Sequence, residues 1–320
     1  MTSELSQRLL QGDKRALSRV LSLVENGYPE GRQVLRETFS QSGRAHTIGI
    51  TGPTGSGKST LVSGLAREFR KRGRTVGIVA IDPTSPFSQG ALLGDRIRMQ
   101  DLTGDPGVFI RSMATRGALG GLAPASNDVV TIMDAADKEV ILVETVGAGQ
   151  DEVEIADTAD TTVVISMPGT GDDIQAIKAG ILEIADILVV NKSDRPGADA
   201  IAKQLHTYMT LNSSEGWEIP IIMTAAHRSE GIPGLADAIQ EHYHYLKESG
   251  RLEELRRHRA RRYILSLAQR HLLNRVLVAA EGSGGLDALV EAVARREIDP
   301  HTGAERLVEA AYGPNQPGTQ

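Results

Sequence analysis

One glycine-rich stretch contains residue types that bind phosphate. Residues 52–59 read Gly-Pro-Thr-Gly-Ser-Gly-Lys-Ser and match the pattern G-x-x-x-x-G-K-[ST] at every fixed position. In this pattern, backbone N–H groups curl around phosphate oxygens, Lys58 reaches the β- and γ-phosphates, and the Ser59 hydroxyl is a ligand of Mg²⁺. The predicted nucleotide-binding residues are Gly52, Pro53, Thr54, Gly55, Ser56, Gly57, Lys58, Ser59 and Thr60.

The residues on either side of this loop predict a strand before it and a helix after it. Residues 46–51 contain β-branched apolar side chains, as a buried strand does. Leu61, Leu65 and Phe69 then recur at helical spacing. A plain glycine turn is the alternative interpretation. The order of strand, glycine loop and helix favours phosphate binding, because the helix N-terminus adds partial positive charge.

Acidic residues follow two of the predicted strands, where they could hold Mg²⁺. Glu144 ends an apolar strand at residues 139–144 and occupies the place of the Walker B acid. Asp82 follows the strand at 75–81, and Asp95 comes after a segment rich in Gly, Pro and Ser that could order around a γ-phosphate. An Asp-Pro turn is the alternative for Asp82. The predicted metal ligands are Ser59, Asp82, Asp95 and Glu144.

Gly147 and Gln150 both follow Glu144 in the sequence, and they could act on the γ-phosphate and on the attacking water. Gly147 could present its N–H to the γ-phosphate. Gln150 could orient the water, as a Gln does in Ras-like enzymes, although there it directly follows the glycine and here it lies three places later. The start of a surface helix is the alternative for Gln150. The predicted catalytic residues from these motifs are Lys58, Glu144 and Gln150.

A second motif predicts recognition of guanine. The sequence Asn191-Lys192-Ser193-Asp194 follows an apolar strand and reads N-K-x-D. The Asp194 carboxylate offers two acceptors for the N1–H and amino group of guanine, whereas adenine would leave it unpaired. Asn191 would reach the N7/O6 side of the base, and Lys192 would lie over the base plane. A second flanking loop, with a backbone N–H for O6, is predicted at Thr224, Ala225 and Ala226. The predicted ligands are therefore GTP and GDP with Mg²⁺.

Strand and helix patterns alternate from residue 46 to about 245 and predict an α/β fold. The expected strands are 46–51, 75–81, 107–112, 139–144, 161–167, 186–191 and 219–224. Short Val- and Ile-rich runs with helical crossovers favour a mostly parallel central sheet flanked by helices on both faces. Ligands bind such sheets outside the carboxyl ends of the strands, where every motif above lies. The predicted fold class is a P-loop NTPase.

The sequence outside this region divides into helical parts and a tail. We expect an N-terminal helical cap at 1–44, the nucleotide-binding domain at 45–248, a C-terminal helical segment at 249–312 and a disordered tail at 313–320. Residues 251–280 predict one long helix, whose first turns are crowded with arginines. A solvated face is one interpretation of these arginines, and a dimer or partner contact is the other.

Composition excludes several classes of protein. The net charge of −6 over 320 residues gives no general attraction to nucleic acid or to an anionic membrane. The absence of cysteine excludes disulfides, zinc-cysteine sites and thiol nucleophiles. No apolar run reaches the length of a membrane span, and the N-terminus has no apolar signal core. We therefore expect a cytoplasmic protein that acts on neither nucleic acid nor membrane.

With these motifs placed, the chain resembles the MeaB/MMAA family of GTPases, also labelled ArgK-type. The matching stretches are GITGPTGSGKSTL (49–61), Asp82-Pro83-Thr84-Ser85, LGDRIRM (93–99), GALGGLA (117–123), VETVGAGQDE (143–152), MPGTGDDIQAIKAGILEIAD (167–186) and NKSD (191–194). The resemblance covers roughly residues 5–310 and is densest from 46 to 195. Differences at Pro53-Thr54, Ala148 and Pro124-Ala125-Ser126 bear on the choice of partner.

The resemblance implies a GTPase that acts as a chaperone of an adenosylcobalamin-dependent acyl-CoA mutase. It implies that GTP hydrolysis is coupled to loading and protection of cobalamin in a methylmalonyl-CoA mutase-like enzyme. It also implies a homodimer through the C-terminal helices, and switch segments at 82–98, 144–157 and 168–180. By the same resemblance, the residues that relay nucleotide state to the mutase are Asp173 and Lys178, with Asp172 beside them. Lys178 is therefore also a candidate for a catalytic role.

Two other functions stay open at this point. A GTPase that inserts a metal such as nickel usually displays Cys or clustered His, and here the nearest useful pair is His242 and His244. A nucleotide-binding regulator of amino-acid transport would need a membrane partner, and the sequence shows no amphipathic anchor.

Overall fold

The computed structural model describes residues 3–82, 99–114, 123–145, 155–169, 179–211, 216–281 and 285–313. The chain divides into two compact units, Met1–Arg259 and Ala260–Gln320. Because Asp95, Gly147, Gln150, Asp172, Asp173 and Lys178 lie outside the described residues, their predicted roles stay predictions.

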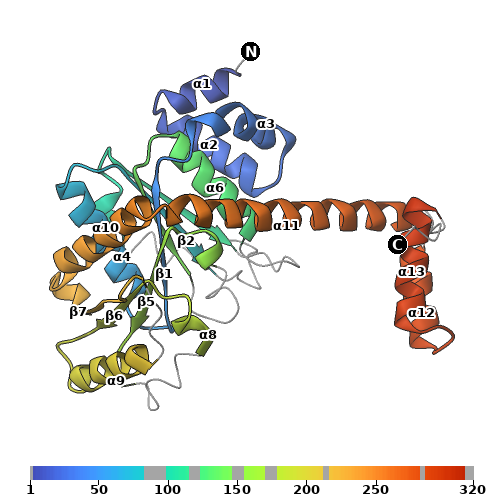
Figure 1. Ribbon diagram of the computed structural model, residues 1–320. Coiled ribbons are helices and arrows are strands. Elements are labelled where there is room, and N and C mark those ends of the chain that lie inside the picture. The colour runs from blue at the N-terminus through green and yellow to red at the C-terminus, as the bar shows by residue number, and fades with distance from the viewer. Residues whose placement is uncertain are drawn as a thin grey trace. The chain divides into compact units, whose positions relative to one another are not determined.

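A seven-stranded parallel sheet forms the centre of the first unit (Figure 1). The strands are β1 (His46–Thr51), β2 (Val76–Asp82), β3 (Val108–Ala114), β4 (Val140–Glu144), β5 (Thr161–Ser166), β6 (Ile187–Asn191) and β7 (Ile221–Thr224), in the spatial order β3-β2-β4-β1-β5-β6-β7. In register, Ile48 of β1 pairs with Leu142 on one side and with Thr161 on the other. The predicted fold class is confirmed, and each strand begins and ends within two residues of its expected bounds.

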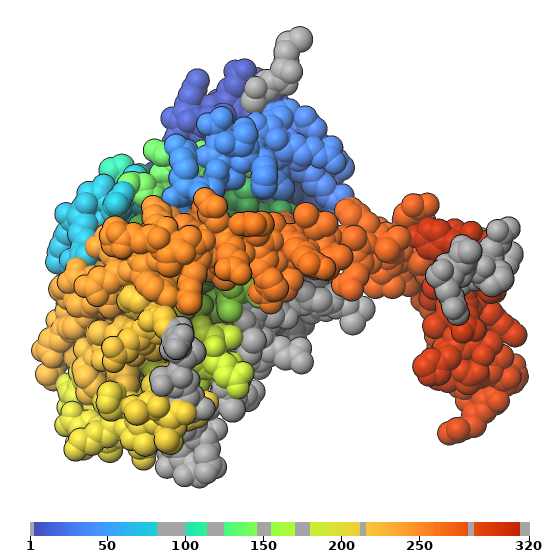
Figure 2. All heavy atoms as spheres, viewed as in Figure 1, coloured from blue at the N-terminus to red at the C-terminus, as the bar shows by residue number. Residues whose placement is uncertain are grey.

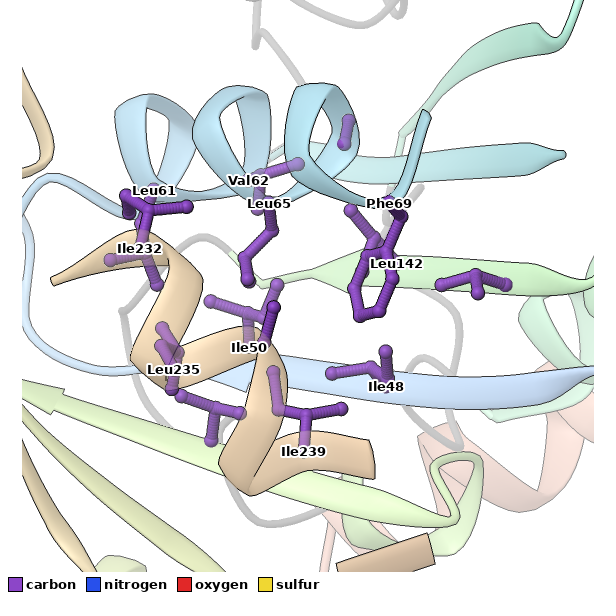
Figure 3. Packing of buried hydrophobic residues seen from close by; sticks show 14 of the residues in the cluster. Ile48, Ile50, Leu61, Val62, Leu65, Phe69, Leu142, Ile232, Leu235 and Ile239 are labelled. Atoms are coloured by element: carbon purple, nitrogen blue, oxygen red, sulfur yellow. The ribbon is translucent and has the colours of Figure 1, made fainter. Parts of the chain in front are cut away.

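Helices α4 (Lys58–Lys71) and α10 (Ile232–Glu248) cover one face of the sheet. Figure 3 shows Leu65 and Phe69 of α4 and Ile239 of α10 converging on Ile48 and Ile50 of β1. These side chains are fully buried. Burying an apolar side chain of this size stabilises the fold by about 1.5–3 kcal/mol. This packing therefore holds α4 against β1, on either side of the glycine loop.

The opposite face is covered by two groups of helices. Over β2 and β4 lie α6 (Ala123–Ala135) and the N-terminal helices α1 (Glu4–Leu10), α2 (Lys14–Glu25) and α3 (Pro29–Thr38). These N-terminal helices, blue in Figures 1 and 2, pack through Leu17 and Leu21 against Ile132 and Met133 of α6. Over β5 and β6 lie α8 (Ala179–Leu182) and α9 (Ala198–Leu211). Four short 3₁₀ helices complete the described part of this unit: η1 (Phe39–Gln41), η2 (Gln100–Leu102), η3 (Ile155–Asp157) and η4 (Ala226–Arg228).

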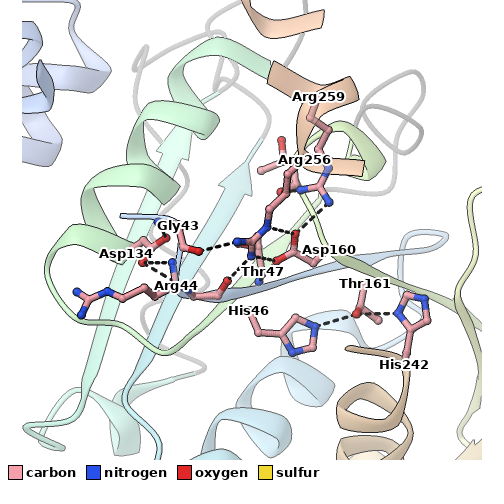
Figure 4. A network of polar contacts seen from close by, with 12 residues as sticks. Gly43, Arg44, His46, Thr47, Asp134, Asp160, Thr161, His242, Arg256 and Arg259 are labelled. Carbon is pink, nitrogen blue, oxygen red and sulfur yellow. Dashed lines mark hydrogen bonds and ion pairs between the residues drawn. The ribbon is translucent and has the colours of Figure 1, made fainter. Parts of the chain in front are cut away.

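Carboxylates accept the first backbone N–H groups at the amino edge of the sheet. Asp160 accepts from Thr47 N at 3.1 Å, and Asp186 accepts from Thr162 N at 2.7 Å. Asp134 accepts from the N–H groups of residues 43–45, at 2.6 to 3.3 Å (Figure 4). A buried N–H without a partner would cost about 1–3 kcal/mol, so these acids complete the strand ends away from the phosphate loop.

Two buried histidines lie at the same edge. Thr161 Oγ1 lies 2.8 Å from His46 Nε2 and 2.9 Å from His242 Nδ1 (Figure 4). The other ring nitrogen of His242 lies 3.4 Å from Asp186. Burial lowers the pKa of His46 to about 3 and that of His242 to about 4. Burial raises the pKa of Asp186 to about 7, so this buried cluster is largely uncharged on the acid side of neutrality.

The second unit is helical. The long helix α11 (Arg251–Glu281) begins in the first unit and continues into the second, followed by α12 (Gly285–Ala294) and α13 (Pro300–Tyr312). Asp299 caps α13 by accepting from His301 N at 2.9 Å. None of the described helices is long and apolar enough to cross a lipid bilayer. The predicted division of the chain into four parts stays a prediction.

Candidate nucleotide-binding site

The glycine loop from Gly52 to Gly57 links the end of β1 to the start of α4. Gly57 has φ +93° and Gly52 has φ +145°. Residues other than glycine rarely adopt such a backbone conformation. A Cβ on Gly57 would lie 2.4 Å from Asn191 Nδ2, and one on Gly52 would lie 2.4 Å from the carbonyl oxygen of Ile165. Glycine is therefore required at both positions, because the loop passes directly over β5 and β6.

Lys58 is the first residue of α4, and its side chain contacts this loop. Its Nζ donates to the carbonyl oxygens of Gly52 at 2.7 Å and of Pro53 at 3.1 Å, and the residue is 7% exposed. A buried ammonium group needs such acceptors, since burial of a charge without partners is costly. The loop thus holds one positive charge at the N-terminus of α4, where the helix dipole also favours an anion.

A hydroxyl and a carboxylate meet at the first turn of α4. Ser59 Oγ donates to Glu144 Oε1 at 2.7 Å, and both residues are buried. Ser59 comes from the glycine-loop motif, while Glu144 is the last residue of β4, next to β1 in the sheet. Both groups are oxygen donors of the kind that Mg²⁺ prefers. The structure therefore brings together two of the four predicted metal ligands.

For the other two predicted metal ligands, Asp82 and Asp95, the structure does not describe the side chains. Asp82 is the last residue of β2, two strands from β1, and its side chain is not described. Asp95 lies outside the described residues.

Sequence reasoning missed a link between the end of β1, which leads into the glycine loop, and the residue after Glu144. Thr145 Oγ1 donates to Thr51 Oγ1 at 3.0 Å, and Thr145 N donates to the carbonyl oxygen of Ile50 at 3.2 Å. Both threonines are buried. The motif patterns fix Glu144 and Gly52 but not the residues beside them, so only the pairing of β1 with β4 reveals this contact.

Asn191 joins three loops through its side-chain amide. Its Nδ2 donates to the carbonyl oxygen of Ser56 at 2.7 Å, in the glycine loop. Its Oδ1 accepts from Thr224 Oγ1 and from Ala226 N, each at 3.1 Å. The predicted guanine loops and the phosphate loop are therefore held by one buried side chain. The other alanine, Ala225, donates its N–H to the carbonyl oxygen of Glu230 at 3.1 Å.

Lys192 and Asp194 lie at the carboxyl end of β6. Lys192 has φ +57°, and its Nζ donates to the carbonyl oxygen of Gly55 at 2.7 Å. Asp194 Oδ2 lies 3.8 Å from His227 Nε2 and 3.8 Å from an Arg228 nitrogen, and its side chain is 18% exposed. These two side chains follow the predicted second guanine loop, and the sequence patterns gave no sign of their approach to Asp194.

The two histidines considered for a metal site do not come together. His242 is buried against Thr161, whereas His244 is exposed and pairs with Glu248 at 3.0 Å. Nor do the described residues contain a group of three or more His, Cys, Asp or Glu side chains placed to hold a metal ion.

A parallel sheet, a phosphate loop at the carboxyl end of β1 and an N-K-x-D loop at the end of β6 define a P-loop guanine-nucleotide-binding protein of the GTPase class. The model of one family, described as methylmalonyl Co-A mutase-associated GTPase MeaB, matches residues 17–281. The chain belongs to this MeaB family and is a GTPase.

Individual relatives agree over nearly the whole chain. A protein of Pyrococcus abyssi whose name describes it as a GTPase is 47% identical over 98% of this chain and 98% of its own length. The methylmalonic aciduria type A homolog of Mus musculus, a mitochondrial protein, is 29% identical over 94% of this chain and 77% of its own. A crystal structure named as an LAO/AO transport system kinase is similar with a TM-score of 0.71, at 26% identity and 96% coverage of each chain.

Proposed function

We propose that this GTPase gates the loading of adenosylcobalamin into an acyl-CoA mutase of the methylmalonyl-CoA mutase type and protects the loaded enzyme. The observation that carries this proposal is the match of residues 17–281 to a family described as associated with methylmalonyl-CoA mutase. The name of the mouse relative refers to methylmalonic aciduria, which also supports a role with an enzyme of methylmalonyl-CoA.

In this proposal GTP and GDP are read by the loops at the ends of β6 and β7. Asp194 accepts from the N1–H and amino group of guanine, and Lys192 lies over the base. Asn191 keeps these loops in register with the phosphate loop through its contacts with Ser56 and Ala226. Selectivity against ATP follows because adenine would leave the Asp194 carboxylate without a donor.

The donor set beside Lys58 fits a magnesium nucleotide. Ser59 Oγ and Glu144 Oε1 already lie 2.7 Å apart, at the N-terminus of α4. We assign both to the residues that would hold Mg²⁺, with Asp82 and Asp95 as further acidic candidates. The metal supplies charge neutralisation at the phosphates when it is bound.

Hydrolysis then depends on groups that stabilise the transferring phosphoryl group. Lys58 leaves its acceptors on Gly52 and Pro53 and neutralises charge on the β- and γ-phosphates. We assign Gly147 to the γ-phosphate and Gln150 to the attacking water. The motifs offer no arginine finger from the chain itself, so we expect weak basal turnover that the mutase raises. The residues assigned to the relay of nucleotide state are Asp172, Asp173 and Lys178.

The C-terminal unit is proposed to form a homodimer. Large apolar side chains stand exposed on its helices: Ile264, Leu265, Leu272, Leu273, Val278, Val290, Val308 and Tyr312. Ile264 is 64% exposed and Val278 is 61% exposed. Exposed apolar residues in this number are typical of an interface, and a second copy of the chain is the proposed occupant. Val278→Glu is expected to shift the sedimentation coefficient from dimer to monomer, whereas an unchanged dimer would refute this interface.

The coupling to the mutase is tested by hydrolysis assays on the purified chain, with and without a cobalamin-dependent acyl-CoA mutase from the same organism. We expect several-fold stimulation with GTP and none with ATP. Equal rates with and without the mutase would refute the coupling. A nickel-inserting GTPase would then become the leading alternative if the protein stimulated metal loading of a metalloenzyme. A transport regulator would instead co-fractionate with membranes.

A further inference from the structure

The first turns of α11 are bound to the amino edge of the sheet by two arginines (Figure 4). Arg256 donates to both oxygens of Asp160, at 3.0 and 3.3 Å, and to the carbonyl oxygens of Gly43 at 2.6 Å and Ala45 at 3.0 Å. Arg259 donates to Asp160 at 3.1 Å and to the carbonyl oxygen of residue 158 at 3.1 Å. The interpretation of these arginines as a solvated face is therefore wrong for two of them.

This joint is held by charge rather than by apolar packing. Of residues 251–259, only Leu252 is buried. The hydrogen bonds of Arg256 and Arg259 with Asp160 and with backbone carbonyl groups therefore make up much of the attachment.

Asp160 is buried and ionised at this point. Its side chain is 2% exposed. Burial alone would raise the pKa of the carboxyl group, but the guanidinium groups of Arg259 and Arg256 more than offset this and hold the pKa below its usual range. Removing one partner of such a buried group is strongly destabilising, because it leaves the other charge buried and uncompensated. The cluster therefore responds strongly to any shift of its members.

The segment that carries Asp160 is layered between α11 and β1. Asp160 N donates to the carbonyl oxygen of Thr47 at 2.7 Å, and its carboxylate accepts from Thr47 N. A Cβ on Gly49 of β1 would lie 2.7 Å from Ile155 and 2.9 Å from Ala159, so these residues press on the strand. β1 leads directly into the glycine loop, and residues 155–157 are the last residues of the expected switch segment 144–157.

One donor in the joint is left without a partner. Arg259 Nε is buried and has no hydrogen-bond partner within the part of the chain that the structure describes. Burial also lowers the pKa of Arg259, despite the carboxylate of Asp160. A buried unsatisfied donor is costly, because it has lost its hydrogen bonds to water.

We propose that Asp160, Arg256 and Arg259 are positioning residues that transmit the nucleotide state from the segment after Glu144 to the base of α11. This inference rests on the proposed function and on the switch segment 144–157 that the family resemblance implies. It adds a route from the nucleotide site to the helix that continues into the second unit. A movement of residues 155–160 shifts the Asp160 carboxylate, and the two arginines shift the first turns of α11 with it.

The test measures amide hydrogen exchange of residues 251–259 in the full-length chain, bound to GDP or to a non-hydrolysable GTP analogue. In the wild type we expect a difference in exchange rate of at least tenfold between the two states. In Arg256→Gln this difference is expected to fall to less than twofold. Arg257→Gln is the matched control, since Arg257 is exposed on the next position of the same helix, and it should keep the wild-type difference.

A purely structural role is separated from transmission by a second variant. In D160N/R256M/R259L, all charges of the cluster are removed together, which avoids leaving one charge buried alone, and the amide oxygen at position 160 can still accept from Thr47 N. We expect this variant to fold, to bind GDP and to hydrolyse GTP at a basal rate within threefold of wild type, yet to lose the nucleotide-dependent exchange difference. A difference that persists in this variant, or that is absent from the wild type, overturns the proposal.

The outcome is distinguishable from failure of the proposed function. If the mutase does not stimulate hydrolysis but the exchange difference is present and depends on Arg256, the joint stands and only the partner is wrong.

Discussion

Replacing Asn191 by alanine should loosen both halves of the nucleotide site at once. The side chain is 2% exposed and makes three hydrogen bonds, to Ser56, Thr224 and Ala226. Asn191→Ala leaves a buried carbonyl oxygen in the glycine loop and a buried N–H at Ala226 without their partners. Each such group costs about 1–3 kcal/mol, so for the two groups we expect a loss of roughly 2–6 kcal/mol in the free energy of unfolding.

The assay is urea denaturation of the nucleotide-free protein, combined with titration of a fluorescent GDP derivative. Because the loop and the base-reading residues are no longer held together, GDP should bind about 10- to 100-fold more weakly, equivalent to roughly 1.4–2.7 kcal/mol. Asn274→Ala is the matched control, since Asn274 is exposed on α11 and should change stability by less than about 0.5 kcal/mol.

Asn191→Asp sharpens this experiment. It keeps an acceptor for Thr224 and Ala226 but replaces the donor to Ser56 by an oxygen, so only the link to the glycine loop is broken. We expect it to weaken GDP binding at least as much as Asn191→Ala. If Asn191→Ala unfolds at the wild-type urea concentration and binds GDP within twofold of wild type, the reasoning about this residue is refuted.

Three further predictions concern the loop and the buried histidines. Lys58→Met should lower the rate of phosphate release from GTP at least 100-fold, because Lys58 carries the positive charge of the glycine loop; a loss below tenfold would contradict its role. Gly52→Ala should lower the free energy of unfolding by roughly 2–4 kcal/mol, because its Cβ would collide with a backbone oxygen, whereas Gly73→Ala, with nothing within 4 Å, should cost only about 1 kcal/mol; equal effects in thermal melts would argue against the collision. Between pH 6.5 and 5, the unfolded chain gains protons on both buried histidines that the folded chain does not, while Asp186 keeps a proton only in the folded state. The net excess of about one proton in the unfolded state means that stability should fall by up to about 1.4 kcal/mol per pH unit as pH decreases, and His242→Gln should flatten this slope in urea titrations; an unchanged slope would show that His242 is charged in the fold.

The strands and the nucleotide motifs could be predicted because each is written in a short stretch of sequence. Strand β1, the glycine loop and α4 are contiguous, so β-branched residues, glycines and helical spacing indicate all three. The N-K-x-D motif likewise follows directly on β6. The same local rules place Glu144 at the end of β4, and the parallel sheet brings it to Ser59.

The amino edge of the sheet could not be predicted in the same way. Asp160 lies 96 residues from Arg256, and no local pattern marks either residue as a partner of the other. Trp217 likewise lies 31 residues from Asp186, and its Nε1 donates to the carbonyl oxygen of Asp186 at 2.8 Å. Such contacts depend on which strand ends are neighbours, and the strand order is a property of the whole chain rather than of any segment.

The most direct test of the central claim is transfer of adenosylcobalamin to apo-mutase, followed by the absorbance of the bound cofactor. Loading should depend on this chain, should proceed with GTP, and should be lost with Lys58→Met or with a non-hydrolysable GTP analogue. Loading at the same rate with GTP, with the analogue and without the chain would contradict the claim that its hydrolysis cycle gates the mutase.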